Sequence, residues 1–184
     1  MTKKQEKEKY KNAILYFSKH LNKYQLGKTK LAKLLYYLDF ISYREKGDSV
    51  TGTEYYKQDY GPLAKDLPEM ISELVEKNDL EVERLEINEK QRHKFKALSD
   101  IEESVFDEDE LILLRKLKNY YADWSTSEMV AKSHLEAPWV QAEEGGKLSY
   151  ELAVDVDDFD RDAQEEYEKE DQELKEAFDK VLAE

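Results

Sequence analysis

Residues able to carry acid–base catalysis are scarce in this 184-residue sequence. A base poised near neutral pH is usually a histidine, and the chain has only His20, His93 and His134. Their spacing offers no HxxxH or HxH pair for a metal ion, and no GxSxG nucleophile elbow accompanies the serines. We therefore expect these histidines to be structural or exposed, and we expect no enzyme activity.

Motifs for nucleotides and metal ions are incomplete. The segment NKYQLGKT (residues 22–29) has asparagine where a phosphate-binding loop needs its first glycine, and an amphipathic pattern where that loop needs a preceding strand. The acidic clusters DEDE and DVDDFDRD lack the spaced glycine and terminal glutamate of a calcium loop. We expect no cofactor and no metal, and we interpret residues 22–29 as a turn between two helices.

Charge is divided unevenly along the chain, whose formal net charge is -14. Residues 1–46 hold twelve Lys or Arg against four Asp or Glu, whereas residues 155–184 hold four against fourteen. The overall sign argues against nucleic-acid binding, and a helix-turn-helix around Gly27 is disfavoured because its second helix has too little polar surface to read bases. No apolar run approaches the roughly 18 residues of a membrane helix. With no cysteine and no apolar leader, we expect a cytoplasmic protein and no membrane partner.

Asp39 is the single carboxylate in an apolar and aromatic run, KLLYYLDFI (residues 33–41). The run belongs to a helix predicted from about Thr29 to Glu45, and no face of that helix is polar. Such a helix must be covered all round by the rest of the fold. Asp39 then needs a lysine, a tyrosine hydroxyl or backbone N–H groups at a turn such as Tyr60–Leu63, because an isolated buried carboxylate is costly. A ligand-contacting Asp39 is the alternative.

Other helices follow from apolar periodicity and capping pairs. Tyr10 to Leu21 predicts an amphipathic helix ending near Gly27, and Leu67 to Val75 predicts another, with Pro68 in its first turn. LSYELAV is a candidate short helix. Two further helix starts carry capping-box spacing, Asp107 with Glu110 and Ser125 with Glu128.

One antiparallel hairpin is predicted from alternating residues. LEVERLEI and HKFKAL alternate apolar and charged residues around the polar NEKQR. Their phase slips between Val82 and Leu85, so we expect a bulge or a break there. The fold class is therefore α+β and predominantly helical, with a central apolar helix packed by other helices and a small antiparallel hairpin. We expect one domain over residues 1–156 and an acidic C-terminal helix over residues 157–184 as its appendage.

The stretch KTKLAKLLYYLDFISYREKGDSVTGTEYYKQDYGPLAKDL (residues 28–67) resembles the Panacea, or SocA-like, antitoxin domain. That domain has a K-L-x-K-L-L-Y-[YF]-x-D helix, a T-G-bearing extended piece and a Y-G-P turn that opens the next helix. SHLEAPW (residues 133–139) and LSYELA resemble its later elements. Pro68 and the acidic tail depart from the pattern.

The resemblance implies a protein of toxin–antitoxin systems, some of them phage-associated, that neutralises a cognate toxin by direct binding. SocA-like members instead deliver the toxin to a protease, so a proteolytic adaptor is one alternative, and a DNA-binding regulator using the basic N-terminal region is another. The toxin and the oligomeric state stay open. Candidate structural or partner-binding residues are Lys33, Tyr36, Tyr37, Asp39, Tyr60, Gly61, Pro62, His134 and Trp139, and those of the acidic tail are Tyr167, Leu174 and Phe178.

For two groups of these residues a structural role is favoured. Aromatic residues at helical spacing usually pack inward, so we expect Tyr36 and Tyr37 in the core rather than at an interface. The Tyr60–Pro62 segment is interpreted as turn geometry, with Gly61 supplying an unusual dihedral angle and Pro62 starting a helix.

Overall fold

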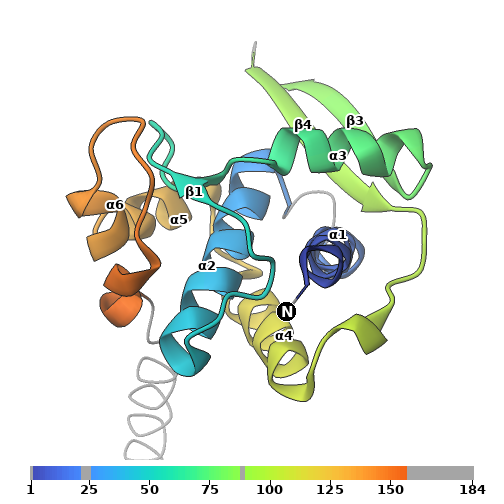
Figure 1. Ribbon diagram of the computed structural model, residues 1–184. Coiled ribbons are helices and arrows are strands. Elements are labelled where there is room, and N and C mark those ends of the chain that lie inside the picture. The colour runs from blue at the N-terminus through green and yellow to red at the C-terminus, as the bar shows by residue number, and fades with distance from the viewer. Residues whose placement is uncertain (1, 22–25, 88–89, 157–184) are drawn as a thin grey trace, which may run out of the picture.

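The computed structural model describes residues 2–21, 26–87 and 90–156. Within these ranges the chain forms six α-helices and two small antiparallel sheets, in agreement with the predicted α+β class. Figure 1 shows the helices gathered around α2, with one hairpin standing above them. In chain order the elements are α1 (Lys3–His20), α2 (Lys28–Lys46), β1 (Tyr55–Tyr56), β2 (Leu63–Ala64), α3 (Leu67–Glu76), β3 (Leu80–Ile87), β4 (Lys90–Ala97), the 3-10 helix η1 (Glu103–Val105), α4 (Glu108–Tyr121), α5 (Thr126–Ser133), α6 (Ala137–Gln141) and the 3-10 helix η2 (Tyr150–Asp155).

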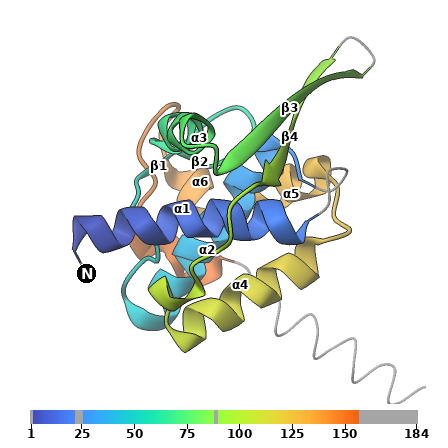
Figure 2. The ribbon, with the colours of Figure 1, turned by 90° about the vertical axis from the view of Figure 1, so that its right-hand side faces the viewer.

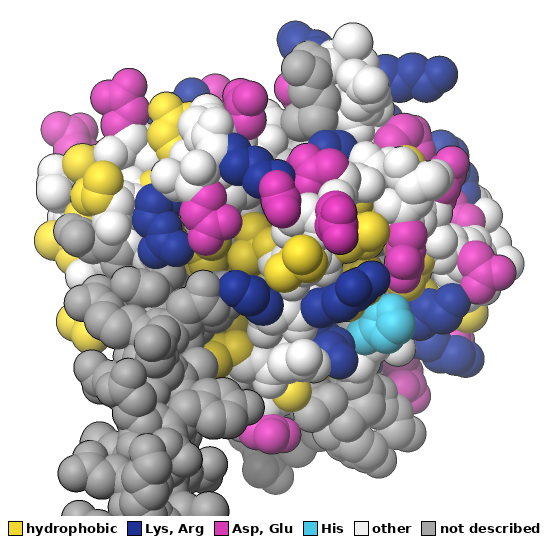
Figure 3. Space-filling view, turned by 90° about the horizontal axis from the view of Figure 1, so that it is seen from below, with side chains coloured by type: hydrophobic (Ala, Val, Ile, Leu, Met, Phe, Trp, Pro, Cys, Tyr) yellow, Lys and Arg dark blue, Asp and Glu magenta, His cyan; other side chains and the backbone are white. Residues whose placement is uncertain are grey.

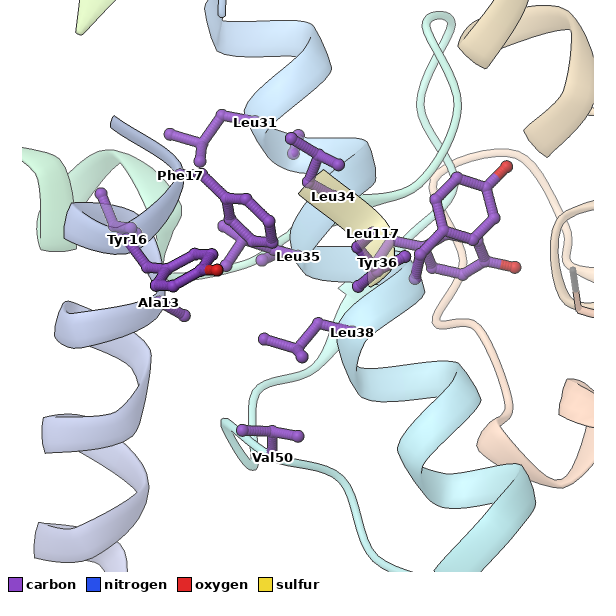
Figure 4. Packing of buried hydrophobic residues seen from close by; sticks show 14 of the residues in the cluster. Ala13, Tyr16, Phe17, Leu31, Leu34, Leu35, Tyr36, Leu38, Val50 and Leu117 are labelled. Carbon is purple, nitrogen blue, oxygen red and sulfur yellow. The ribbon is translucent and has the colours of Figure 1, made fainter. Parts of the chain in front are cut away.

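Helix α2 is the centre of the core. Every residue from Lys30 to Ser42 is buried, which confirms that a helix with no polar face must be covered on all sides. Helices α1, α4 and α5, strand β2 and η2 all contact it. The helix ends at Gly47, whose φ of 79° provides the left-handed cap that favours glycine. In Figure 4, Phe17 of α1 and Leu117 of α4 lie on different sides of the leucines of α2.

Helix α1 is longer at its N-terminus than the apolar pattern predicts. It begins at Lys3 because Thr2 and Gln5 form a capping box, in which the Gln5 amide donates to Thr2 Oγ1 at 3.3 Å and the Thr2 amide to Gln5 Oε1 at 2.9 Å. It ends at His20, and the turn to α2 runs partly through residues outside the described ranges. The apolar half of α1 packs on α2.

Both predicted capping boxes are confirmed. Asp107 caps α4 and Ser125 caps α5, each paired reciprocally with the glutamate three residues later. The connector after α5 is more ordered than the sequence indicates, since it contains α6, which has Pro138 in its first turn. The short helix expected at LSYELAV is the 3-10 helix η2.

The hairpin of β3 and β4 is regular. All eight residues of each strand pair in one uninterrupted register, so the predicted bulge between Val82 and Leu85 is wrong. Figure 2 shows the outer part of the hairpin projecting from the body. The base packs on the core, with Leu80 and Phe95 buried there. Because a strand needs a constant apolar face only where it covers a core, the phase slip requires no extra residue.

Pro62 does not begin a helix, and that prediction is wrong. Residues 63–64 are extended and pair with β1, and the Lys65 amide continues this pairing by donating to the Glu54 carbonyl at 2.9 Å. Their backbone groups are therefore committed to a small sheet. Helix α3 begins later, at Leu67, with Pro68 in its first turn as the sequence predicts.

The acidic tail lies outside the described residues, and so do the predictions made for it. This includes the helix expected there and its candidates Tyr167, Leu174 and Phe178. Among the helices that the structure describes, none combines the length and apolar character required to cross a membrane.

Candidate functional site

Helix α2 carries three buried Lys or Asp side chains, Lys30, Lys33 and Asp39, and most of the candidate residues gather around Lys33. Lys33 is 1% exposed and Asp39 is 0% exposed. The Lys33 cluster is defined as Lys33, the turn of residues 58–62 and residues 133–139. It therefore unites five further candidates from segments far apart in the sequence, namely Tyr60, Gly61, Pro62, His134 and Trp139.

Lys33 ties the turn to the central helix. Its Nζ donates to the Pro62 carbonyl at 2.8 Å. Burial lowers the pKa of Lys33 to about 7, although the carboxylate of Glu136 acts in the opposite direction. Glu136 is itself 6% exposed. An amine with such a pKa could serve as a base in an open site, but this one is 1% exposed and lies under the turn.

Gly61 is required by the close packing of the turn. Its φ is 86°, in the left-handed region, and its amide donates to the Gln58 carbonyl at 2.8 Å. A Cβ at this position would lie 2.6 Å from Ser133 Oγ and 2.7 Å from Lys33 Nζ. The predicted unusual dihedral angle is thus confirmed, and the absence of a side chain matters as much as the angle.

His134 and Trp139 form an aromatic pair beside the turn. Their rings are stacked with centroids 3.9 Å apart and planes inclined by 12°. Lys57 Nζ lies 4.2 Å from the centroid of the Trp139 ring, and Trp139 Nε1 donates to the Gln58 carbonyl at 3.4 Å. Burial and the nearby charges of Lys33 and Lys57 lower the pKa of His134, which favours the neutral ring. This pair fixes the α5–α6 segment against the turn.

Large apolar side chains are exposed on the segments that the Lys33 cluster holds together. Tyr60 is 72% exposed, Leu135 83% and Val140 55%. Each is adjacent to, or within two residues of, a buried member of the cluster, namely Gly61, Glu136 or Pro138. Exposed apolar groups on a rigid support are typical of a protein-binding surface rather than of a catalytic cleft.

Asp39 belongs to a separate cluster with a structural role. Its carboxylate accepts hydrogen bonds from the Thr51 amide at 2.7 Å, from Thr51 Oγ1 at 2.5 Å and from the Tyr55 hydroxyl at 2.7 Å. Burial raises the pKa of Asp39 to about 6, and these hydrogen bonds oppose the rise. The expected tyrosine hydroxyl is present, but the backbone donor comes from Thr51 and not from the turn at residues 60–63.

Tyr36 and Tyr37 are core residues, as predicted. Both are fully buried. The Tyr36 ring packs on Phe40 with centroids 4.4 Å apart, and the Tyr37 ring stacks on Tyr121 at 4.9 Å. They set the spacing between α2 and its neighbours.

Two residues were not identified from the sequence, Glu136 within the Lys33 cluster and Lys57 at its border. Glu136 lies between His134 and Trp139 in the quoted SHLEAPW motif, and a charge in that position could have suggested a buried partner for Lys33. Lys57 carried no such signal, because nothing in YYKQDYG distinguishes a lysine that covers a distant tryptophan. Across residues 2–21, 26–87 and 90–156, no group of side chains could hold a metal ion.

Comparison with known proteins identifies a family. The family model described as Antitoxin SocA-like, Panacea domain, matches residues 31–140, a span that contains the Lys33 cluster and the Asp39 cluster. No curated protein and no solved structure matches the chain.

Proposed function

This chain belongs to the antitoxin SocA-like Panacea domain family, and we propose that it neutralises a cognate toxin by direct protein–protein binding. The observation that supports this mechanism is the exposure of Tyr60, Leu135 and Val140 on segments fixed by buried contacts. Apolar and aromatic groups held rigidly bind with little loss of conformational entropy. In this proposal the toxin's active surface is covered by that apolar surface.

The Lys33 cluster has a supporting part in the proposal. The Lys33–Pro62 hydrogen bond fixes the turn that carries Tyr60, and the His134–Trp139 stack fixes the segment that carries Leu135 and Val140. Motif residues of the family would then position the binding surface, and the exposed residues would choose the partner. Such a division suits a domain that serves different toxins.

Partner binding is tested by placing charges on the exposed apolar positions. The toxin candidate is the product of the adjacent gene, first tested for growth arrest with and without this protein. The double variant Leu135→Asp with Val140→Asp should bind that toxin at least tenfold more weakly by titration calorimetry and should no longer restore growth. The matched control is Leu98→Asp, since Leu98 is 44% exposed and lies just after β4, away from this surface. Unchanged binding by the double variant would contradict the proposal.

The proteolytic-adaptor alternative gives a different result in the same cells. Occlusion leaves the half-life of the toxin unchanged while growth is restored. An adaptor shortens that half-life, and the effect disappears when the protease is deleted.

The acidic tail is proposed as a second contact, on the ground of its sequence alone. Residues 155–184 hold fourteen acidic residues against four basic ones, and an acidic segment speeds the capture of a basic toxin. Truncation after residue 156 should slow toxin association, most clearly at low salt, and an unchanged association rate would rule the contact out.

A further inference from the structure

The outer face of α4 combines an exposed apolar group with a hollow at one end. The exposed residues of this helix recur at helical spacing, namely Glu108, Asp109, Ile112, Arg115, Lys116 and Asn119. The hollow has a volume of about 350 Å³ and lies between α4 and the C-terminal end of α2. Ile112 and Leu113 line it, and Ile112 is 41% exposed. A large aliphatic side chain is therefore open to contact at the middle of this face.

Positive charge gathers where the C-terminal half of α4 lies near the end of α1. Figure 2 shows α1 and α4 running in the same direction, and the two helices contact each other. Arg115 and Lys118 form no ion pair within the part of the chain that the structure describes. On α1, burial lowers the pKa of His20, and the charges of Lys118 and Lys19 lower it further. These basic side chains are thus close enough to act on one another.

Acidic residues balance this charge only in part. Glu103 acts on the pKa of His20 in the opposite direction. Asp100 accepts from Lys19 Nζ at 2.8 Å, but its own side chain is 99% exposed, and an ion pair so exposed is weak because water screens it. Lys19 and the three basic residues within 115–118 outnumber these two carboxylates. This end of the face therefore keeps a net positive charge.

The last described residue lies next to the other end of the same face. The Val156 carbonyl accepts from Arg44 Nη1 at 2.6 Å, and the next two residues of α2, Glu45 and Lys46, line the hollow. Lys46 also pairs with Asp109, in the first turn of α4, at 2.9 Å. The chain therefore leaves the described fold beside the hollow and beside the start of α4.

The segment that follows Val156 complements this face in charge, apolar pattern and length. Residues 157–184 hold thirteen Asp or Glu against four Lys or Arg. The helix predicted for them from the sequence has Tyr167, Leu174 and Phe178 on one stripe. A helix of these 28 residues would be about 42 Å long, about twice the roughly 21 Å of the 14-residue α4. Such a segment can reach from Val156 along the whole of α4.

We propose that residues 157–184 dock on the outer face of α4 of the same chain. Their apolar stripe covers Ile112 and the hollow, and their carboxylates face Arg115, Lys118 and the end of α1. Exposed ion pairs contribute little to stability one by one, so the apolar contact holds the segment and the charges select its position. The contact forms readily because a tether within one chain gives the segment a high effective concentration at the face.

This docking does not require the proposed toxin contact of the acidic tail. Both contacts use the same carboxylates, so a basic toxin that captures the tail has to displace it from α4. Docking is measured on the protein alone, without any toxin. Its failure would leave the toxin contact standing, and an unchanged rate of toxin association would leave the docking standing.

A spin label on the tail tests the proposal in the full chain. The sequence has no cysteine, so Gln172→Cys provides one site for a nitroxide. Gln172 is two residues from Leu174, on the opposite side of the predicted helix, and the label does not disturb the stripe. We expect the amide NMR signals of Ile112, Arg115 and Lys118 to be at least twofold weaker with the active nitroxide than after its reduction. High salt should restore them in part.

Two double variants of the labelled chain remove the two halves of the contact. Arg115→Glu with Lys118→Glu reverses the charge of the face, and the Ile112 signal should recover at least half of its lost intensity. Leu174→Ser with Phe178→Ser should do the same and changes no residue of the described fold. The control is Lys65→Glu with Lys96→Glu, which alters the net charge equally at side chains that are 60% and 72% exposed and lie outside α1, α2 and α4. It should leave the weakening unchanged.

The same measurement shows where else the tail could bind. Full signals along α4 in the labelled chain, or weakening confined to other elements, would refute the docking site. For a second copy as the occupant, nitroxide-carrying chains are mixed with isotope-labelled chains that lack the nitroxide. Weakening of α4 signals in that mixture, as strong as within the labelled chain, would overturn the assignment to the same chain.

Discussion

Asp39 and Lys33, two of the three buried charged side chains of α2, are six residues apart and are used in different ways. Three hydrogen bonds from Thr51 and Tyr55 surround the carboxylate of Asp39, and all of these residues are buried. Lys33 instead donates to the carbonyl of Pro62, in a turn whose Tyr60 side chain is largely exposed. A buried carboxylate can thus complete the interior of a domain, while a buried amine on the same helix can support a surface.

Two places on the surface also differ, in how far their apolar side chains are exposed. Figure 3 shows hydrophobic side chains at the centre of the lower face, bordered by Lys, Arg, Asp and Glu. Elsewhere on the surface a hollow is lined by Ile112, Lys46 and Lys116, and Lys46 is already paired with Asp107 and Asp109. At the Lys33 cluster, by comparison, Leu135 is 83% exposed, about twice the 41% of Ile112. For this reason the proposed toxin contact is placed at the cluster.

Removing the Asp39 carboxylate should have the largest effect. Asp39→Ala leaves the buried Thr51 amide and Tyr55 hydroxyl without an acceptor, so we expect the free energy of unfolding to fall by about 4 kcal/mol. Asp39→Asn keeps the shape, and the two hydroxyls can turn to accept, so its loss should be less than half as large. Urea denaturation measures both, and an equal loss in the two variants would contradict the hydrogen-bond explanation.

Adding a side chain at Gly61, inside the Lys33 cluster, should cause the second-largest loss of stability. Gly61→Ala combines an unfavourable φ with a clash against Ser133 and Lys33, and we expect a loss of about 3 kcal/mol. Gly47→Ala is the matched control, since Gly47 has a φ of 79° but a Cβ there would meet no atom within 4 Å; it should lose about 1 kcal/mol. If Gly61→Ala and Gly47→Ala lost similar free energies of unfolding, the close packing of Gly61 against Lys33 would contribute nothing to stability.

The pH dependence of stability tests the charge of Lys33. Because its pKa is about 7 in the folded chain, against an ordinary lysine value of 10.5, the unfolded chain binds more protons between these limits. Stability therefore rises with pH in this range, by about 2 kcal/mol from pH 7 to pH 9. Lys33→Met should remove that rise in thermal or urea unfolding. A variant with the wild-type slope would show that another group is responsible.

Below pH 6, Asp39 should make stability fall as pH rises, which is opposite to the effect of Lys33 above pH 7. Its pKa is about 6 in the folded chain, against an ordinary aspartate value of 3.8, so the folded chain binds the additional proton between these values. The Asp39 contribution to stability therefore falls as pH rises from about 4 to 6, and Asp39→Asn should lose this dependence.

The smallest expected effect is at the edge of the Lys33 cluster. Lys57→Gln removes the charge above Trp139 and the ion pair with Glu144 at 3.2 Å, whose carboxylate is mostly exposed. We expect a loss of about 1 kcal/mol or less. A loss as large as that of Gly61→Ala would show that Lys57 belongs to the interior of the cluster and not to its edge.

The sequence was sufficient to predict those elements whose signal lies in residues close together along the chain. Two capping boxes placed the starts of α4 and α5, Pro68 marked the first turn of α3, and the apolar run around Asp39 identified the central helix. Each depends on residues a few positions apart, so the signal can be read from the sequence without knowing any distant partner. The prediction of a bulge in the hairpin was wrong, because the phase of an apolar pattern requires an extra residue only where the strand covers a core, and the outer part of this hairpin projects from the body.

By itself, then, the sequence determined that one apolar helix must be enclosed, that its charges need partners and that the chain resembles an antitoxin family. Only the tertiary structure decided which partners those are. Lys33 donates to Pro62 and lies in the field of Glu136, and Asp39 accepts from Thr51 and Tyr55, so these partners lie from 12 to over 100 positions away along the chain. Such pairings depend on how helices and loops pack in space, and residue spacing along the chain does not encode that directly.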